Sequence, residues 1–285
     1  MGNSNLNAAK KAKNDEFYTT MPDIVAELSY YKGHFKNKVV YCNCDTKESN
    51  FVKYFTDNFA ELGLKKLITS SLSEGTPFES GKGIELLKQC DIVVTNPPFS
   101  LFTSFFEMLM KYNKKFLIIG NHNVIASINV FPRYLSKLVW LGVTHPKEFI
   151  IPDKHKLKGS SYVNSIGESI ALLCNTSWFT NLQHHVVNEE ILLNKEYNES
   201  EYIKYDQYDA IEVSRTADIP KNYNGIMGVP ISFLNKYTEG QFEIVGYSGG
   251  EQQLKKVFNK YKGTITINGI EPYRRIFIKH KKPLP

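Results

Sequence analysis

The chain has 285 residues, of which 42% are hydrophobic and 13% aromatic, so it can bury a substantial core. No apolar run is long enough to cross a bilayer, and residues 1–17 lack the apolar stretch of a secretory signal, which together predict a cytoplasmic protein. The formal net charge of +6 is compatible with nucleic-acid binding but does not identify it.

Strand-like apolar runs alternate with amphipathic stretches through the first half of the chain. Helices are expected over residues 23–31, 49–62, 83–89 and 101–112. Strands are expected over residues 38–42, 66–70, 91–95, 115–120, 137–143 and 169–174. This alternation predicts an α/β fold with a mostly parallel sheet.

The composition changes near Gln183, where charged, Tyr-rich and turn-rich sequence begins. We therefore divide the chain into a large domain, residues 1–183, and a smaller, irregular region, residues 184–285. Within the second part, short strands are expected over residues 242–247, 264–268 and 275–279.

The four cysteines predict buried free thiols. None of Cys42, Cys44, Cys90 and Cys174 belongs to a C-x-x-C pair, so neither a disulfide nor a metal site is expected.

Positive charge is concentrated at the end of the chain. Residues 250–285 carry nine Lys or Arg and two Asp or Glu, whereas residues 186–249 carry five basic and eleven acidic residues. A second basic cluster follows an apolar segment near residue 150. A solvated surface explains such runs equally well, but they can also neutralise phosphates. The candidate nucleic-acid contacts are Lys154, Lys156, Lys158, Arg274, Arg275 and Lys279.

The most informative segment is Asp91-Ile-Val-Val-Thr-Asn-Pro-Pro-Phe-Ser, in which an apolar strand ends at Asn96, Pro97, Pro98 and Phe99. In open α/β sheets, ligands bind at the carboxyl ends of strands. The Asn96 side-chain oxygen and the Pro97 carbonyl can accept hydrogen bonds from an amino group such as the exocyclic N6 of adenine. They would hold its lone pair in line for attack on a methyl group, without a strong base.

Two further features of this segment suit a nucleic-acid base. The prolines stiffen the loop, and Phe99 offers a face on which an extruded base can stack. The alternative is a proline-rich turn that follows a strand by chance, which composition makes about a one-in-a-hundred event.

This segment resembles motif IV of amino-methyltransferases, and the whole chain resembles the EcoRI-type adenine-specific DNA methyltransferases. The matching stretches are D-E-F-Y-T-T, Y-C-N-C-D-T-K-E-S-N-F-V-K-Y-F, K-F-L-I-I-G-N, W-F-T-N-L, Y-D-A-I-E-V, M-G-V-P-I-S-F-L and N-G-I-E-P-Y-R-R-I-F-I-K. The resemblance implies a Rossmann-like catalytic domain that binds S-adenosylmethionine and a C-terminal target-recognition region that binds double-stranded DNA. A restriction endonuclease that acts on the same sequence is compatible with the resemblance, which implies no direct contact with it and does not establish its presence.

The resemblance assigns three sets of site residues. The catalytic tetrapeptide is Asn96 to Phe99. The segment Phe17, Tyr18, Thr19 and Thr20 matches the motif that holds the methionine end of the cofactor, where a Thr hydroxyl can bind the carboxylate. The turn Cys42, Asn43, Cys44 and Asp45 stands where the first strand meets the cofactor.

The chain departs from common methyltransferase patterns in two places. The turn after the first strand contains no glycine, although such glycine-poor turns are typical of this subgroup. Family members also carry an acidic residue near a Phe that contacts the cofactor adenine. This chain has Gly75-Thr-Pro-Phe-Glu-Ser there, and Phe78 is expected to pack on the adenine ring.

Several other functions compete with DNA methylation. The same tetrapeptide serves enzymes that methylate RNA bases or a protein glutamine, and a catalytically silent DNA-binding homologue could keep the fold. A nicotinamide-dependent dehydrogenase is disfavoured because no G-x-G-x-x-G follows any strand.

Overall fold

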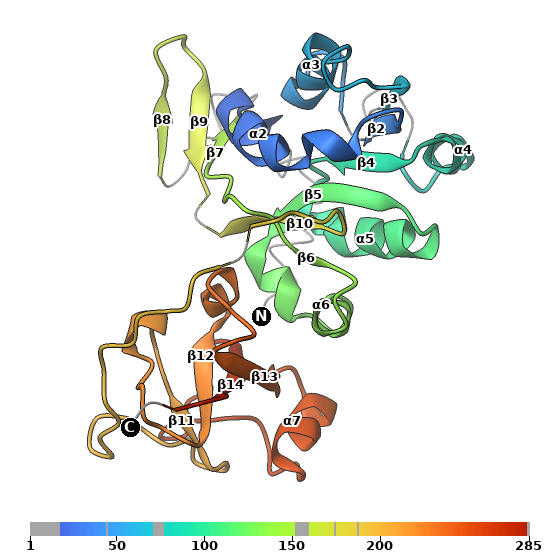
Figure 1. Cartoon of the computed structure of the whole chain (residues 1–285). Coiled ribbons are helices and arrows are strands. Elements are labelled where there is room, and N and C mark those ends of the chain that lie inside the picture. Colours follow the sequence, from blue (N-terminus) through green and yellow to red (C-terminus); the bar gives the residue numbers. More distant parts are fainter. Residues whose placement is uncertain are drawn as a thin grey trace. The chain divides into compact units, whose positions relative to one another are not determined.

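A computed structural model describes residues 18–43, 45–70, 77–151, 160–173, 175–186 and 188–283 (Figure 1). The chain forms two compact units. The first comprises residues 1–124 and 133–185, and the second comprises residues 125–132 and 186–285. Nothing in the sequence indicated that residues 125–132 belong with the C-terminal unit. None of the helices in the described ranges is long and apolar enough to span a membrane.

The first unit is built on a six-stranded sheet of order β3-β2-β4-β5-β10-β6. Its strands are β2 (Val39–Asn43), β3 (Lys66–Ser70), β4 (Ile92–Thr95), β5 (Lys115–Asn121), β6 (Trp140–Leu141) and β10 (Thr176–Thr180). Strands β3, β2, β4 and β5 are parallel, whereas β10 runs antiparallel to β5 and β6. The predicted α/β class is confirmed, with an antiparallel addition at one edge.

Helices cover both faces of this sheet, which explains the uninterrupted apolar runs of its strands. They are α2 (Met21–Leu28), α3 (Asn50–Asp57), α4 (Gly81–Gln89) and α5 (Phe102–Lys111). Along β5, Leu117 and Ile119 join the buried cluster formed with α2 and α3. The intervening Phe116 packs edge-on against Phe106 of α5, with ring centroids 5.8 Å apart. Successive side chains of a strand therefore anchor opposite helical layers.

A second, antiparallel sheet of order β1-β7-β9-β8 completes the first unit. Its strands are β1 (Tyr18–Thr19), β7 (Glu148–Ile150), β8 (Ser161–Val163) and β9 (Ser169–Leu172). The buried carboxylate of Glu27 in α2 fixes the chain between the two sheets, because it accepts hydrogen bonds from the amides of Val143 and Thr144 at 2.9 and 2.6 Å.

The second unit contains a four-stranded sheet of order β11-β12-β14-β13. Its regular elements are β11 (Ala210–Glu212), β12 (Ile226–Pro230), β13 (Phe242–Tyr247), β14 (Arg275–His280) and α7 (Glu251–Phe258). Leu254 of α7 joins a buried cluster with Tyr205, Tyr208 and Phe277.

Short helical segments connect these elements. They are α6 (Phe131–Leu135) and the 3₁₀ helices η1 (Ser29–His34), η2 (Phe99–Leu101), η3 (His122–Ala126), η5 (Thr216–Asp218) and η6 (Ile231–Asn235).

Three predicted elements differ from those observed. The helix expected over residues 49–62 ends at Asp57, where the Asn58 side chain donates to the Tyr54 carbonyl and so satisfies the helix end. The strand expected over residues 137–143 is confined to Trp140–Leu141, and the Val143 and Thr144 amides bind Glu27 instead of a neighbouring strand. Residues 264–268 form no strand and make one isolated bridge.

Candidate functional site

The carboxyl ends of β2 and β4 form the centre of the candidate site. These strands are parallel neighbours, with Val40 opposite Ile92 and Tyr41 opposite Val93, so both chains leave the sheet at the same edge. The turn after β2 carries Asp45, and the segment after β4 is Asn96-Pro97-Pro98. Two sequence-predicted segments from different parts of the chain are therefore brought together.

Thr95, the last residue of β4, joins the two turns. Its hydroxyl contacts the Asn43 carbonyl and lies 2.7 Å from Oδ2 of Asp45. The Asp45 amide in turn donates to the Ser70 carbonyl of β3 at 3.0 Å. Three adjacent strand ends are thus linked by buried hydrogen bonds, which hold the backbone of the site rigid.

Asp45 is buried, and its environment favours the protonated acid. Burial raises the pKa of Asp45 to about 7, although hydrogen bonds from Thr95 and Ser49 oppose the rise. Perturbed carboxyl groups of this kind cluster at functional sites. The protonation of Asp45 is therefore sensitive to charge placed nearby.

The tetrapeptide after β4 combines a rigid backbone with two partly exposed side chains. Pro97 and Pro98 are buried, whereas Asn96 and Phe99 are half-buried. The Pro98 carbonyl accepts a hydrogen bond from the Leu101 amide at 2.8 Å and so begins η2. Asn96 and Phe99 are consequently presented from a fixed turn, as the sequence predicts for a site that binds a base.

Phe149 of β7 connects this tetrapeptide to β1. Its ring lies edge-on to Phe99 with centroids 6.4 Å apart, and its backbone is paired with Thr19. The Thr19 carbonyl also accepts a hydrogen bond from the Asn50 side chain at 2.9 Å. The predicted methionine-holding segment and the predicted catalytic segment therefore share one neighbour.

The Thr19 side chain has a buried hydroxyl for which the described part of the chain supplies no hydrogen-bond partner. Leaving a buried hydroxyl unsatisfied costs free energy, so this group is available to donate a hydrogen bond to a ligand atom. Thr20 is also buried and precedes α2, and Tyr18 is half-buried. The residues present thus fit a ligand carboxylate at β1.

The remaining predicted cofactor residues are either buried or outside the described residues. The Cys42 side chain belongs to the hydrophobic core, and burial raises the pKa of its thiol. Asn43 is buried at the end of β2. Phe78 is buried edge-on against Phe105 of α5, with centroids 5.1 Å apart. Phe17 and Cys44 lie outside the described residues.

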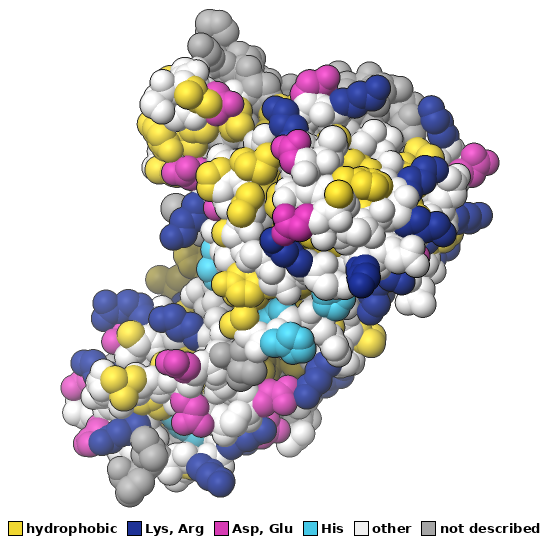
Figure 2. Space-filling model, turned by 45° about the horizontal axis from the view of Figure 1, so that its top comes forward, with side chains coloured by type: hydrophobic (Ala, Val, Ile, Leu, Met, Phe, Trp, Pro, Cys, Tyr) yellow, Lys and Arg dark blue, Asp and Glu magenta, His cyan; other side chains and the backbone are white. Residues whose placement is uncertain are grey.

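The predicted nucleic-acid contacts also divide into groups. Lys154, Lys156 and Lys158 lie outside the described residues. Lys279 lies in β14 opposite Glu243 of β13. On the face drawn in Figure 2, Lys and Arg side chains are interspersed with Asp and Glu side chains. Charge alone therefore does not show which basic residues contact nucleic acid, and their positions in the fold must be considered as well.

Arg274 and Arg275 are neighbours in sequence with different surroundings. The Arg275 guanidinium forms an ion pair with Glu212 at 2.6 Å, and both side chains are nearly buried. Arg274 is exposed and donates from Nη1 to the Ala126 carbonyl at 2.6 Å. Arg275 thus stabilises the second unit, whereas Arg274 faces solvent.

Sequence reasoning overlooked Thr95 and Phe149. A threonine that closes an apolar strand directly before Asn-Pro-Pro was a usable signal for Thr95. Phe149 had no such signal, because only the pairing of β1 with β7 places it beside Thr19. Among the residues that the structure describes, no group of three or more His, Cys, Asp or Glu side chains could hold a metal ion.

Comparison with known proteins gives a consistent result over nearly the whole chain. The family model described as adenine-specific methyltransferase EcoRI matches residues 5–77 and 70–281. The chain is 42% identical to the type II methyltransferase M.EcoRI of Escherichia coli, covering 98% of this chain and 97% of that protein. It is 37% identical to the type II methyltransferase M.MgeORF184P of Mycoplasma genitalium, covering 97% and 99% of the two chains. The type II methyltransferase M.MpnI of Mycoplasma pneumoniae is 38% identical, with 84% of each chain covered.

Proposed function

Because the chain belongs to the EcoRI family of adenine-specific methyltransferases, we propose that it methylates the exocyclic N6 of adenine at a specific sequence in duplex DNA. The methyl donor is S-adenosylmethionine. The observation that carries the proposal is the linkage of the Asn96-Pro97-Pro98-Phe99 segment to the buried Asp45 turn through Thr95. A turn that occurred by chance would not need a second polar turn fixed beside it.

The proposed division of labour follows the two parts of the sequence. Residues 1–183 form a Rossmann-like catalytic domain, supported by the parallel order β3-β2-β4-β5 with helices on both faces. Residues 184–285 form the target-recognition region, supported by the concentration of basic residues near its end. A restriction endonuclease that cuts the same sequence is the proposed counterpart in the cell, without direct contact.

Asn96 and Pro97 are the proposed catalytic residues. The Asn96 side-chain oxygen and the Pro97 carbonyl accept hydrogen bonds from the two N6 hydrogens of the target adenine. These contacts direct the nitrogen lone pair out of conjugation with the ring, and the two carbonyl dipoles stabilise the positive charge that develops on nitrogen. When bound, S-adenosylmethionine supplies an electrophilic methyl group.

The other residues position the two reactants. Phe99 stacks against the extruded adenine and excludes water from one of its faces. The unsatisfied Thr19 hydroxyl donates to the carboxylate at the methionine end of the cofactor, and Thr20 and Tyr18 flank it. The turn from Cys42 to Asp45 contacts the cofactor mainly through its backbone, because the Cys42 side chain points into the core. Phe78 is proposed to pack on the cofactor adenine.

A labelled methyl group tests the proposal against its closest alternatives. The full chain is incubated with S-adenosylmethionine carrying a labelled methyl and with unmethylated duplex DNA, RNA or protein. The DNA is then digested to nucleosides. Label in N6-methyldeoxyadenosine is expected. Label confined to RNA or to a glutamine side chain would overturn the DNA assignment, and cofactor binding without any transfer would favour a silent homologue.

A further inference from the structure

A tight turn of the second unit, residues 267–270, precedes β14. Ile267 and Ile270 exchange two backbone hydrogen bonds of 2.9 and 3.0 Å, and the residues between them, Asn268 and Gly269, have φ values of 51° and 77°. Two consecutive positive φ values are typical of a type I′ turn, for which Asn-Gly is the preferred sequence. We refer to residues 267–274 as the reading segment.

Asp206 holds this segment in place. Its carboxylate accepts hydrogen bonds from the amides of Asn268 and Gly269 at 3.0 and 2.9 Å, and from the Thr266 hydroxyl at 2.6 Å. Gln207 adds a hydrogen bond of 2.7 Å to the same hydroxyl. These contacts lower the pKa of Asp206, so the clamp is charged at neutral pH. The turn is thus a fixed structure and not a loose loop.

The reading segment displays large apolar side chains to water. Ile270 is 73% exposed and Tyr273 is 90% exposed, the latter being the most exposed large hydrophobic residue described. Single exposed apolar residues are common, but here one closes a rigid turn and a second follows it by three residues, directly before an exposed arginine. Neither residue contributes to the hydrophobic core of the second unit.

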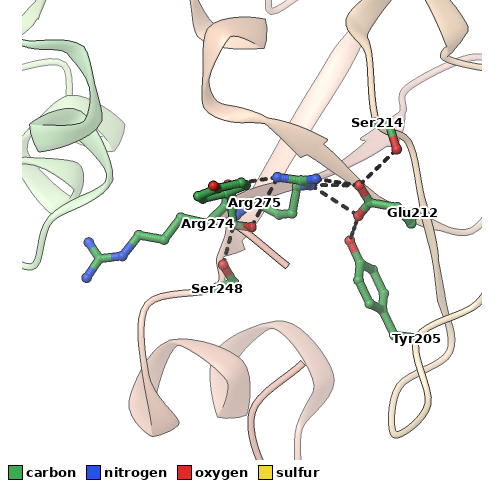
Figure 3. Close-up of polar contacts among 7 residues, drawn as sticks. Tyr205, Glu212, Ser214, Ser248, Arg274 and Arg275 are labelled. Carbon is green, nitrogen blue, oxygen red and sulfur yellow. Dashed lines mark hydrogen bonds and ion pairs between the residues drawn. The ribbon is translucent and has the colours of Figure 1, made fainter. Parts of the chain in front are cut away.

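Figure 3 shows how the two neighbouring arginines differ. The Arg275 side chain points to Glu212, which it contacts through Nε at 2.9 Å and Nη2 at 2.6 Å, and Tyr205 donates to the same carboxylate. The Arg274 side chain points away from this group, and the residue as a whole is exposed. Its hydrogen bond from Nη1 to the Ala126 carbonyl orients the guanidinium. Among the described residues, Nε and Nη2 have no hydrogen-bond partner, so this edge can bind another molecule.

We propose that the reading segment contacts base edges of the target duplex, with Arg274 reading a guanine and with Ile270 and Tyr273 covering adjacent apolar base edges. This inference rests on the proposed function and identifies the element that recognises its substrate. Arginine contacts guanine O6 and N7 with two parallel hydrogen bonds, and apolar side chains contact the thymine methyl group.

The proposed function makes DNA the occupant of this surface, and the local sequence is compatible with it. The segment lies within residues 250–285, where basic residues outnumber acidic ones by seven. Glu271 within the segment is exposed and would repel phosphate, so a simple phosphate clamp fits poorly. Contact with base edges fits better, because an acidic side chain can accept a hydrogen bond from cytosine N4.

The test compares variants on duplexes that differ by single base pairs. The target sequence is first mapped with the wild-type chain, and kcat/KM is then measured for the target and for each single substitution. The variants are Arg274→Ala, Arg274→Lys and Tyr273→Ala. The matched controls are Arg215→Ala, another exposed arginine of the second unit, and Leu192→Ala, another exposed apolar residue. Circular dichroism and thermal melting verify that every variant is folded.

The expected result is a loss of discrimination at one guanine-cytosine pair. Arg274→Ala should lower kcat/KM on the target about 5- to 150-fold while activity on duplexes altered at that pair is unchanged. Arg274→Lys should fail in the same way, because an ammonium group cannot make two parallel hydrogen bonds. Tyr273→Ala should weaken discrimination at a neighbouring pair, and both controls should match the wild type.

Two results would overturn the proposal. If Arg274→Ala lowers activity equally on all duplexes and Arg274→Lys restores it, Arg274 binds phosphate. If both Arg274 variants match Arg215→Ala, the segment does not contact DNA. A wild-type chain that methylates no duplex would instead refute the proposed function itself, and it would do so before any variant is made.

Discussion

The strand ends of the first unit and the reading segment of the second unit are both held by hydrogen bonds to a carboxyl group, but one carboxyl group is buried and the other is exposed. At the ends of β2 and β4, Thr95 and Asp45 are buried and their hydrogen bonds stiffen the backbone. In the second unit, Asp206 is exposed and its hydrogen bonds fix a turn that displays apolar side chains to water. Chemistry on a small group requires a dry, rigid site, whereas recognition of a long duplex requires rigid groups on the surface.

The largest expected effect is on the stability of the second unit and concerns the ion pair between Arg275, which follows the reading segment, and Glu212. Glu212→Ala leaves the nearly buried Arg275 guanidinium without its counter-charge, so we expect a loss of about 3–5 kcal/mol in the free energy of unfolding. Urea denaturation measures this loss. Arg215→Ala breaks an ion pair with Asp218 in which Arg215 is 79% exposed, and should cost at most about 1 kcal/mol. Equal losses in the two variants would show that the Arg275 pair has no special structural role.

The next largest effect concerns cofactor binding by the Thr19 hydroxyl in the first unit. Thr19→Val removes a buried hydroxyl that lacks a partner in the described residues, so the variant should be at least as stable as the wild type. It should nevertheless lose about 1.5–3 kcal/mol of S-adenosylmethionine affinity, the usual contribution of a hydrogen bond to a charged group. Titration calorimetry and thermal melting measure the two quantities.

Thr180→Val is the matched control for this variant. The Thr180 hydroxyl is buried but donates to the Phe116 carbonyl at 2.7 Å. This variant should lose stability and keep its cofactor affinity. If Thr19→Val shows the same pattern, the Thr19 hydroxyl does not bind the cofactor.

Phe99→Ala tests the stacking face of the catalytic segment. Stacking of a base on an aromatic side chain contributes about 1–3 kcal/mol, so kcat/KM on duplex DNA should fall by a corresponding factor. Cofactor affinity should be unchanged. Phe99→Tyr keeps the ring and should retain most activity, whereas a Phe99→Ala variant with normal kcat/KM would remove Phe99 from the site.

The most gradual effect is a pH dependence of stability that arises from Asp45. Its pKa is about 7 in the folded chain, above its ordinary value of 3.8, so the folded state binds the proton more tightly than the unfolded state does. The resulting stabilisation is complete below the unfolded pKa and is lost as the pH rises through the folded pKa. Relative to Asp45→Asn, the wild type should therefore lose up to about 1.4 kcal/mol per pH unit within this window. Parallel unfolding curves for the two proteins across it would contradict the burial of this carboxyl.

The sequence predicted the parts of the fold that depend on local pattern. The run Asp91 to Phe99 contains an apolar strand and a stiff proline turn, and both are observed where they were expected. Contacts between distant residues were not predictable. Arg275 is paired with Glu212, which lies 63 positions earlier. Thr264–Asn268 forms no strand, and the Thr266 and Asn268 amides bind the Gln207 and Asp206 side chains instead of a neighbouring strand.

In the candidate site too, local sequence features were predictable, whereas contacts between distant residues were not. The tetrapeptide and the Thr19 segment were identified from residue type and family resemblance, but their common neighbour Phe149 follows only from sheet pairing. The resemblance treated Cys42 as one of four similar turn residues, whereas the alternation of side chains along β2 places its thiol in the core. The cofactor and DNA contacts assigned to individual residues remain predictions.

The most direct test of the catalytic assignment is methyl transfer by Asn96→Ala, measured beside its S-adenosylmethionine affinity. Removing one preorganised hydrogen-bonding group from an active site lowers the rate by about 100- to 1,000-fold. We predict a loss of at least this size in the single-turnover rate on duplex DNA, with cofactor affinity and thermal stability close to those of the wild type. An Asn96→Ala variant that transfers methyl groups at the wild-type rate would contradict the account.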